Sequence, residues 1–531
     1  MTAIRTHLHD LLAQAAAATP AAPALSYRGT TVDYEEVWRM SRTAAAQLLT
    51  VGLQRGDRVA IYLEKRIETV VSIFAVSAAG GVFVPVNPVL KPTQVWHILS
   101  DSGAEVLVTS AERLPQLAAI LPATRITQVI VVGDGAASDR TASGDMAADG
   151  AASLLLHRWE HGQLAAGEPA SSSAIDVDPA AILYTSGSTG SPKGVVVSHR
   201  NLIVGAESVS SYLGNTSDDV ILSVLPLSFD AGLSQVTTAF SVGAHCVLMN
   251  YLLPREVPRL CEQYGVTGLT CVPPLWLQLA DLDWPEETAQ RLRYWANTGG
   301  RMPRATLDRL RGVFTTAEPY LMYGLTEAFR STYLDPAEVD RRPDSIGRAI
   351  PNAEVLVLRP DGTPCAPGEE GELVHRGALV TLGYWNDPVR TAERYRLVRH
   401  PQWRAPETAV WSGDTVVADA DGFLYFVGRK DHMIKTSGYR VSPDEIEEAA
   451  YSTGLVRDAV ALGVDDPALG QRIVLVATPT ATGLDVVALT AALKKLLPLY
   501  MVPSRIELRE ELLRSPNGKY DRTLLAEEVV A

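Results

Sequence analysis

The chain has 531 residues, more than one hydrophobic core usually serves, so we expect two or three domains. A formal net charge of −14 argues against a broad nucleic-acid-binding surface, and 47% hydrophobic with 20% charged residues is typical of a globular protein. The four cysteines lack metal-site spacing and the N-terminus lacks the apolar core of a signal peptide, so we expect a reduced, cytoplasmic protein without nucleic-acid or membrane partners.

Residues 1–130 alternate helical and strand-like patterns, which predicts a largely parallel sheet with helices on both faces. The most apolar run, at 70–86, is interrupted by serine and glycine and predicts a helix followed by a buried strand rather than a membrane span. Residues 134–178 are rich in Ala, Gly, Ser and Asp, and we expect a long, mobile excursion there. The expected helices are 8–17 and 34–53, and the expected strands are 58–63 and 105–109.

The alternation resumes at 180–335, and then the pattern changes. Short strands bounded by Pro-Asp-Gly, Pro-Gly and Asp-Gly turns predict a β-rich subdomain at 346–427. Ser442 followed by Glu445 predicts a capping box that begins a helix. We therefore expect an α/β fold, with a large N-terminal domain of parallel αβα sheets at 1–430 and a small α+β domain at 431–531. The expected strands are 220–225, 244–249, 268–272, 292–297, 353–358, 371–376, 423–427, 459–464 and 473–478, and the expected helices are 303–313 and 486–496.

Between two apolar runs, 180–184 and 195–197, lies the stretch TSGSTGSPKG at 185–194. Strand, polar glycine loop, strand is the expected structure. Glycines let backbone N–H groups turn toward one anion, hydroxyls add donors, and Lys193 adds positive charge, so the stretch suits a polyphosphate. A flexible surface turn is the alternative. The lysine follows Pro192 and does not have the spacing of a Walker A motif.

The stretch resembles the phosphate loop of the adenylate-forming superfamily, which comprises acyl-CoA synthetases, luciferases and the adenylation domains of peptide synthetases. Further motifs follow in the order of that family. The resemblance implies a large N-terminal domain, a mobile C-terminal domain, and ATP and Mg²⁺ as cofactors. The implied ATP-binding residues are Thr185, Ser186, Gly187, Ser188, Thr189, Gly190, Lys193, Tyr323, Thr326, Asp414, Arg429 and Lys519.

The segment YGLTE at 323–327 matches the family's Y-G-x-T-E motif. The resemblance implies that Thr326 contacts phosphate and that Glu327 binds Mg²⁺. Mg²⁺ is a hard cation that prefers oxygen ligands. Ser412-Gly413-Asp414 is similar to the segment whose aspartate accepts both ribose hydroxyls. Alone, each of these short motifs is weak, and a surface turn is the alternative for the first.

Residues 428–441, GRKDHMIKTSGYRV, resemble the family's hinge motif. The resemblance places Asp431 at the hinge, and it places Lys435 and Gly438 in a segment that faces the active site during thioester formation. Pro516-Asn517-Gly518-Lys519 is similar to the C-terminal catalytic motif, so Lys519, with Lys193 and Glu327, would stabilise charge at the reacting phosphate. The implied reaction is attack of a carboxylate on the α-phosphorus of ATP, followed by rotation at the hinge and thiol attack on the adenylate.

The segment LPLSFDAGLS at 225–234 bears on the substrate. Acyl-CoA synthetases usually carry a histidine here, whereas amino-acid adenylation domains carry Phe-Asp, which Phe229-Asp230 resembles. A buried aspartate needs a cationic partner, so Asp230 is expected to bind the substrate's ammonium. The alternative is a helix N-cap, because an apolar helical pattern follows Asp230.

Arg330 follows the YGLTE motif in a segment that lines the acyl pocket in the superfamily. An arginine there can bind a second carboxylate of the substrate through two parallel hydrogen bonds. Thr298 and Gly299 of the NTGG segment are expected beside it. The alternative is a structural ion pair with Asp335 or Glu338. Phe229, Asp230, Thr298, Gly299 and Arg330 are thus the expected substrate-binding residues.

The wider sequence is similar to the stand-alone enzymes that load β-amino acids for macrolactam polyketides and to the exosortase-associated AMP-forming ligases. We expect adenylation of an acidic amino acid, of the L-aspartate or 3-methylaspartate type. Twelve residues follow Lys519, so the thiol is expected on another molecule, the phosphopantetheine of an acyl carrier protein. The alternatives are an acyl-CoA ligase acting on a simple acid with free CoA, and a non-catalytic nucleotide-binding protein with the same fold.

Overall fold

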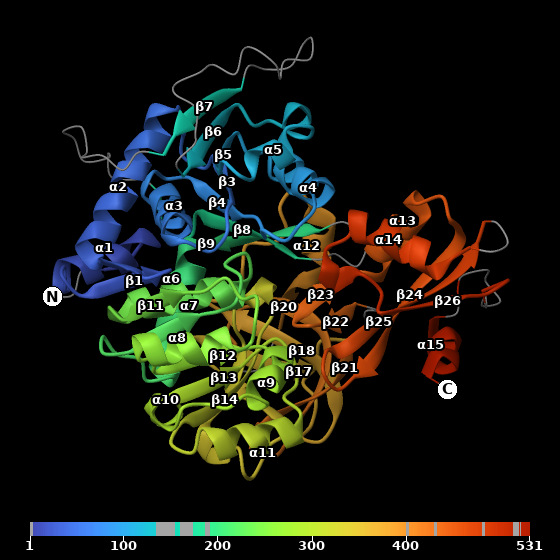
Figure 1. Cartoon of the computed structure of the whole chain (residues 1–531). Coiled ribbons are helices and arrows are strands. Elements are labelled where there is room, and N and C mark those ends of the chain that lie inside the picture. Colours follow the sequence, from blue (N-terminus) through green and yellow to red (C-terminus); the bar gives the residue numbers. More distant parts are fainter. Residues whose placement is uncertain are drawn as a thin grey trace.

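The computed structural model describes residues 4–133, 154–159, 174–185, 192–399, 403–429, 433–480, 484–512, 520 and 522–530. The chain has a mixed α/β fold, with a large N-terminal domain built on two sheets and a small C-terminal domain at the right of Figure 1. This is the fold class that the sequence predicts. Within the placed residues, none of the helices combines the length and the apolar character that a bilayer crossing requires.

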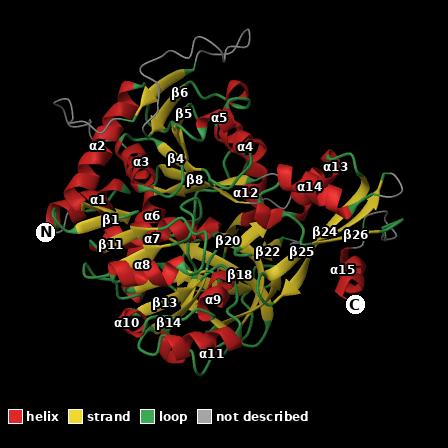
Figure 2. Ribbon diagram, viewed as in Figure 1, coloured by secondary structure: helices red, strands yellow, loops and turns green. Residues whose placement is uncertain are grey.

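The upper sheet in Figure 1 has seven strands in the order β7-β6-β5-β3-β4-β8-β9, parallel except for β9. Alternate side chains of β3 contact helices on opposite faces: Val59 and Ile61 pack with α3, whereas Ala60 and Tyr62 pack with α4. The helices flank this sheet in Figure 2. The strands are β3 (Arg58–Tyr62), β4 (Val82–Pro85), β5 (Val106–Ser110), β6 (Gln128–Val132), β7 (Leu155–Arg158), β8 (Pro179–Thr185) and β9 (Lys193–Ser198), and the helices are α1 (His9–Ala18), α2 (Tyr34–Thr50), α3 (Ile67–Ala78), α4 (Pro92–Ser102) and α5 (Leu114–Leu117).

Two expectations for this part are decided by the structure. The apolar run at 70–86 is helix α3 followed by the buried strand β4, which confirms that prediction. The expected excursion at 134–178 is only partly described, and its described part includes the edge strand β7, which pairs with β6. The sequence prediction missed this strand because it is short and lies in a stretch of small and polar residues.

The lower sheet has a parallel centre, β11-β10-β12-β13-β14, and an antiparallel extension that runs through β15 and β16 to β21, β20, β18 and β17. The β-rich stretch therefore continues the central sheet. The strands are β1 (Pro23–Tyr27), β2 (Thr30–Asp33), β10 (Val220–Ser223), β11 (His245–Leu248), β12 (Gly268–Cys271), β13 (Tyr294–Asn297), β14 (Glu318–Tyr323), β15 (Thr332–Leu334), β16 (Ser345–Ala349), β17 (Ala353–Leu358), β18 (Glu370–Gly377), β19 (Tyr395–Val398), β20 (Glu407–Ala418) and β21 (Leu424–Arg429). The helices are α6 (His199–Tyr212), α7 (Asp230–Val242), α8 (Glu256–Tyr264), α9 (Pro273–Ala280), α10 (Glu286–Arg291), α11 (Arg304–Val313) and α12 (Pro388–Arg394).

The C-terminal domain has its own sheet, in which β23-β22-β25-β24 are neighbours and β26 pairs with β25. Ser442 occupies the N-cap of α13, but its side chain makes no cap hydrogen bond, so the predicted capping box is wrong. Glu445 instead accepts a hydrogen bond from Gln94 of the large domain, at 3.1 Å. The elements are β22 (Ile434–Thr436), β23 (Tyr439–Val441), α13 (Pro443–Ser452), β24 (Val456–Asp466), β25 (Gly470–Pro479), α14 (Val486–Leu496), β26 (Arg505–Leu508) and α15 (Arg522–Val530).

Candidate active site

A cavity of about 790 Å³ lies where the two domains meet. Its walls include the loops that follow β10, β12 and β13, which is where open parallel sheets usually bind ligands. The predicted residues that line it are Thr185, Phe229, Asp230, Thr298, Gly299, Thr326, Glu327, Arg330, Asp414, Lys435 and Gly438. Ser186, Gly187, Ser188, Thr189, Gly190, Asp431, Lys519 and the Arg429 side chain lie outside the described residues.

The predicted phosphate loop joins an antiparallel pair of strands. Strands β8 and β9 are antiparallel, and Thr185 lies opposite Lys193. The two expected strands are therefore confirmed, and residues 186–191 between them lie outside the described residues. Both ends of the loop, at Thr185 and Pro192, line the cavity.

Lys193 and Glu327 form a buried ion pair beside the loop. The Lys193 Nζ atom lies 2.9 Å from Glu327 Oε1, and the two side chains are 10% and 4% exposed. The Tyr384 hydroxyl also donates to Oε1, at 2.6 Å. Burial alone would raise the pKa of Glu327, but the charges of Lys193 and Arg440, together with the Tyr384 hydroxyl, hold that pKa well below its usual range. Glu327 is thus an ionised carboxylate at neutral pH.

The same carboxylate fits Mg²⁺. Both hydrogen bonds described for the Glu327 carboxylate reach Oε1, and none to Oε2 is described among the placed residues. An ionised oxygen facing the cavity suits a cation that is usually held by one or two carboxylates together with substrate phosphates. Glu327 would therefore hold Mg²⁺, which would neutralise charge on the ATP phosphates.

One short turn aims two of the predicted residues into the cavity. Glu327 lies in the 3-10 turn η2 (Thr326–Ala328), and Phe329 follows it with a φ of +52°, a conformation that is costly for a bulky residue. The Phe329 ring is held against Gly205, where an added Cβ atom would lie 2.5 Å from the ring. Glycine at 205 therefore permits the turn that brings Glu327 and Arg330 to one cavity.

The YGLTE and Ser-Gly-Asp motifs meet directly. The Tyr323 hydroxyl donates to Asp414 Oδ2 at 2.5 Å, and both residues are buried. Asp414 lies opposite Arg429 in the β20–β21 pairing. The structure thus brings the expected ribose carboxylate to the cavity wall with a tyrosine that fixes one of its oxygens.

Asp230 opens helix α7 but does not cap it. The N-cap is Phe229, and no side-chain cap hydrogen bond is made, so the capping alternative for Asp230 is wrong. The Asp230 carboxyl faces the cavity, where burial raises its pKa and the charge of Arg330 partly counteracts that effect. A carboxylate in such surroundings gains from a cationic ligand.

Arg330 is 3% exposed, and no acidic side chain of the described residues forms an ion pair with it. Its Nη1 atom donates to Thr298 Oγ1 at 2.9 Å, whereas its buried Nε atom has no hydrogen-bond partner among the described residues. Asp335 accepts from the backbone of Ala337, and Glu338 pairs with Arg342, so the predicted alternative of an ion pair with either is wrong. The guanidinium keeps donor capacity for a ligand.

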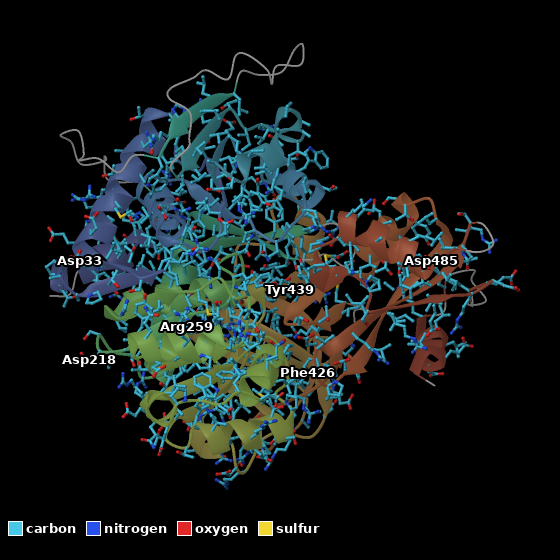
Figure 3. The ribbon with its side chains drawn as sticks, in the orientation of Figure 1. Asp33, Asp218, Arg259, Phe426, Tyr439 and Asp485 are labelled. Carbon is cyan, nitrogen blue, oxygen red and sulfur yellow. The ribbon has the colours of Figure 1, made fainter. Side chains whose placement is uncertain are left out.

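The C-terminal domain contributes the hairpin β22–β23 to the cavity. An added Cβ atom at Gly438 would lie 2.9 Å from Val272 of the large domain, so only glycine allows this close approach. Tyr439, labelled in Figure 3 where the two domains meet, stacks on Tyr500 with ring centroids 3.7 Å apart and presents an edge contact to Phe229 at 5.2 Å. The segment that the sequence assigns to thioester formation thus lines the cavity, and its role stays a prediction.

Sequence reasoning missed several side chains of this site. Tyr384 and Tyr500 lie in segments without a recognisable motif, and only the folded chain brings them to Glu327 and Tyr439. Lys65 also lines the cavity, although its sequence context reads as an ordinary turn before a helix. No local pattern could have identified these residues.

Comparisons with known proteins agree with this geometry. A family model described as "AMP-binding enzyme" matches residues 12–385, and one described as "AMP-binding enzyme C-terminal domain" matches residues 445–519. A long-chain-fatty-acid–CoA ligase of Salmonella typhimurium is 30% identical over 98% of this chain and 94% of its own length. An L-proline–[L-prolyl-carrier protein] ligase of Streptomyces coelicolor is 33% identical over 92% of this chain and 90% of its own length. The amide bond synthetase McbA from Marinactinospora thermotolerans has the same fold, with a TM-score of 0.84, 22% identity and coverage of 98% of this chain and 99% of that one.

Proposed function

Since this chain belongs to the AMP-binding enzyme family, whose matched relatives are ligases, we propose that it adenylates an acidic amino acid and transfers the acyl group to a thiol. The substrate class is that of L-aspartate and 3-methylaspartate. The thiol is the phosphopantetheine of a separate acyl carrier protein.

The pairing of Asp230 with Arg330 in one cavity carries this proposal. Asp230 is a carboxylate that burial disfavours, and Arg330 is a buried cation whose described partner is a hydroxyl. A ligand with an ammonium and a second carboxylate would satisfy both at once. A simple fatty acid would offer no charged group to either side chain, and each would have only the other's charge to offset its burial.

In the first step the reacting carboxylate attacks the α-phosphorus of ATP, and the bond from that phosphorus to the bridging oxygen breaks. Pyrophosphate leaves, and the acyl-adenylate remains. Asp230 and Arg330 hold the amino acid so that its reacting carboxylate faces the phosphate side of the cavity. Lys193 supplies positive charge there, Glu327 would hold Mg²⁺, and Asp414 would accept the ribose hydroxyls.

In the second step a thiol sulfur attacks the acyl carbon, AMP leaves, and the thiol proton passes to solvent. The hairpin with Gly438 and Tyr439 lines the cavity in the arrangement described, which suits this step. An acyl-CoA ligase that uses free CoA remains the second candidate, because a fatty-acid CoA ligase is among the relatives that match nearly the whole chain.

The test is ATP–pyrophosphate exchange with aspartate, 3-methylaspartate, glutamate, alanine, β-alanine, proline and a short fatty acid. We expect exchange with the acidic amino acids and its loss in Asp230→Asn, because the variant cannot pair with the substrate ammonium. Asp218→Asn, a substitution of the same kind at the exposed residue labelled in Figure 3, is the matched control and should behave as wild type. Exchange with the fatty acid alone would instead establish the CoA ligase.

The acceptor is tested separately, with the acyl-adenylate formed in place. We expect thioester on a carrier protein that bears phosphopantetheine and little acyl-CoA when free CoA replaces it. Acyl-CoA formation at the same rate would remove the carrier protein from the proposal and leave the adenylation step intact.

A further inference from the structure

A second buried cation, Lys65, lines the cavity. It is 6% exposed and lies between strand β3 and helix α3. Its backbone is fixed by the side chain of Asn250, which accepts from Lys65 N at 2.9 Å and donates to Lys65 O at 2.8 Å. The position of this lysine is therefore set by the protein before any ligand binds.

The Lys65 ammonium has one described acceptor. Its Nζ atom donates to the backbone oxygen of Ser223 at 2.6 Å, and no acidic side chain within the placed residues forms an ion pair with it. The adjacent Glu64 pairs with Arg113. Since an ammonium has three donors, two stay available. Burial lowers the pKa of Lys65 to about 7, and no carboxylate among the described residues opposes this effect.

The hydrogen-bond partners of Lys65 and Arg330 lie at the carboxyl ends of two different strands of the lower sheet. Ser223, which holds Lys65, ends β10, whereas Thr298, which holds Arg330, directly follows β13. Strand β12 lies between β10 and β13. Neighbouring strands are about 4.8 Å apart, so the two anchor points are on the order of 10 Å apart along the edge.

The wall near Lys65 contains apolar side chains as well as the polar residues Glu64, Thr69 and Asn250. Leu63, Val224 and Met249 line the cavity and are sequence neighbours of Lys65, Ser223 and Asn250. An uncompensated cation in such surroundings is costly unless a ligand supplies an acceptor. A flexible methylene chain that ends in a carboxylate has the matching chemistry.

We propose that Lys65 is a second carboxylate anchor of the acyl pocket, which binds the distal carboxylate of amino diacids longer than glutamate. This inference rests on the proposed function and deepens it. Asp230 holds the ammonium in every case, Arg330 anchors the second carboxylate of aspartate-length substrates, and Lys65 anchors that of longer ones. The enzyme then has two length classes of substrate rather than one.

The experiment measures exchange kcat/KM over two matched series. One is L-aspartate, L-glutamate, L-2-aminoadipate, L-2-aminopimelate and L-2-aminosuberate, and the other is the corresponding diacids without the amine. The variants are Lys65→Met and Arg330→Met, with Lys494→Met at an exposed lysine of α14 as the matched control. Methionine is unbranched and only one atom shorter than lysine, and it removes the charge, so Lys65→Met should fold.

We expect the ratio of kcat/KM for 2-aminosuberate over aspartate to fall about 30-fold in Lys65→Met, the size expected when one partner of a buried charge pair is removed. The same ratio should rise in Arg330→Met, and it should stay at the wild-type value in Lys494→Met. The proposal would be overturned if this ratio changed in the same direction in Lys65→Met and Arg330→Met, or if it did not change in Lys65→Met. Lys65 would then be a structural residue.

A measurement on the wild-type chain is independent of how the variants fold. Labelling of Lys65 by an amine-acylating reagent, followed by mass spectrometry, should be suppressed by 2-aminosuberate and not by aspartate. Equal suppression by both would contradict the proposal.

The two series separate this proposal from the proposed function. If the diacids without an amine exchange as well as the amino diacids, Asp230 does not bind an ammonium. The role of Lys65 would still be tested by whether Lys65→Met lowers kcat/KM for the long diacids relative to the short ones. If no acid of either series supports exchange, both proposals fail.

Discussion

The two halves of the cavity hold carboxylates with opposite surroundings. On the nucleotide side, the ion pair with Lys193 and a hydroxyl from Tyr384 hold the pKa of Glu327 below its usual range. On the side proposed to bind the acid, burial raises the pKa of Asp230, the charge of Arg330 offsets this only in part, and Arg330 donates its hydrogen bond to a threonine. In the half proposed to bind the nucleotide, Glu327 is paired with Lys193, whereas in the half proposed to bind the acid, Asp230 and Arg330 form no described ion pair and could each accept a charged ligand group.

On the proposed function, this difference separates the residues that act on every substrate from those that select the acid. ATP is common to all members of such a family, so its half of the site can be built from internally paired groups. The acyl half must distinguish one acid from another, and charges that a wrong substrate leaves unpaired provide that distinction. Substitutions on the two sides should therefore have different substrate dependence.

The largest effect is expected on the nucleotide side. Glu327→Gln should lower exchange about a hundredfold or more with every acid, because it removes a fixed charge at the reacting phosphate and leaves Lys193 without its partner. Rates measured with aspartate and with a poor substrate should fall by the same factor. Glu338→Gln, which alters a carboxylate outside the cavity lining, is the control. A loss that depends on the acid would place Glu327 in substrate selection and break the comparison.

A smaller effect is expected at Tyr384. Tyr384→Phe removes one hydrogen bond to the Glu327 carboxylate. It should lower the exchange rate about tenfold, because that factor corresponds to the usual energy of a hydrogen bond to a charged group. The loss should again be equal for all acids. Tyr333→Phe, at a tyrosine that stacks on Tyr212 away from the cavity, serves as the control. An unchanged rate would show that Lys193 alone holds Glu327.

The smallest effect concerns stability on the acyl side. Because the folded pKa of Asp230 is raised, the folded chain keeps a proton that the unfolded chain has lost, and stability falls as pH rises from about 4 through the raised value. Asp230→Asn removes this penalty, so its Tm should exceed that of wild type by about 1–2 °C at neutral pH.

The two Tm values should converge below about pH 3, where Asp230 is protonated in both states. Thermal melts of both proteins across this pH range, without ligand, measure the difference. A variant less stable than wild type at neutral pH would mean that Asp230 is already paired inside the protein. The contrast with Glu327 would then disappear.

Much of the fold could be predicted from local sequence patterns. The helix at α14 and the strand at β17 have the predicted bounds, and most other elements differ by a few residues at their ends. The failures are also local in origin. The spacing of Ser442 and Glu445 satisfies the capping-box pattern, but Glu445 contacts Gln94 of the other domain, because tertiary contacts outweigh the small energy of a cap.

The candidate site was predictable only where a residue belongs to a motif. Phe229, Asp230 and Arg330 could be identified from their segments, and the structure places all three at the cavity. Whether Asp230 caps its helix and whether Arg330 pairs with Asp335 could not be decided from spacing. Both alternatives depend on side-chain directions, which the sequence does not encode in its local pattern.

The sequence by itself determined the glycine loop between two apolar strands, the alternation of helices and strands, and the segments that carry charge. These features follow from backbone preferences and from the period of apolar residues, which act within a few neighbouring positions. Only the tertiary structure decided which charges meet. Lys193 and Glu327 are 134 residues apart, Tyr384 and Glu327 are 57 apart, and Arg330 and Thr298 are 32 apart. Pairings over such separations are fixed only when the elements of the large domain pack together, and that packing also leaves Asp230, Arg330 and Lys65 facing one cavity.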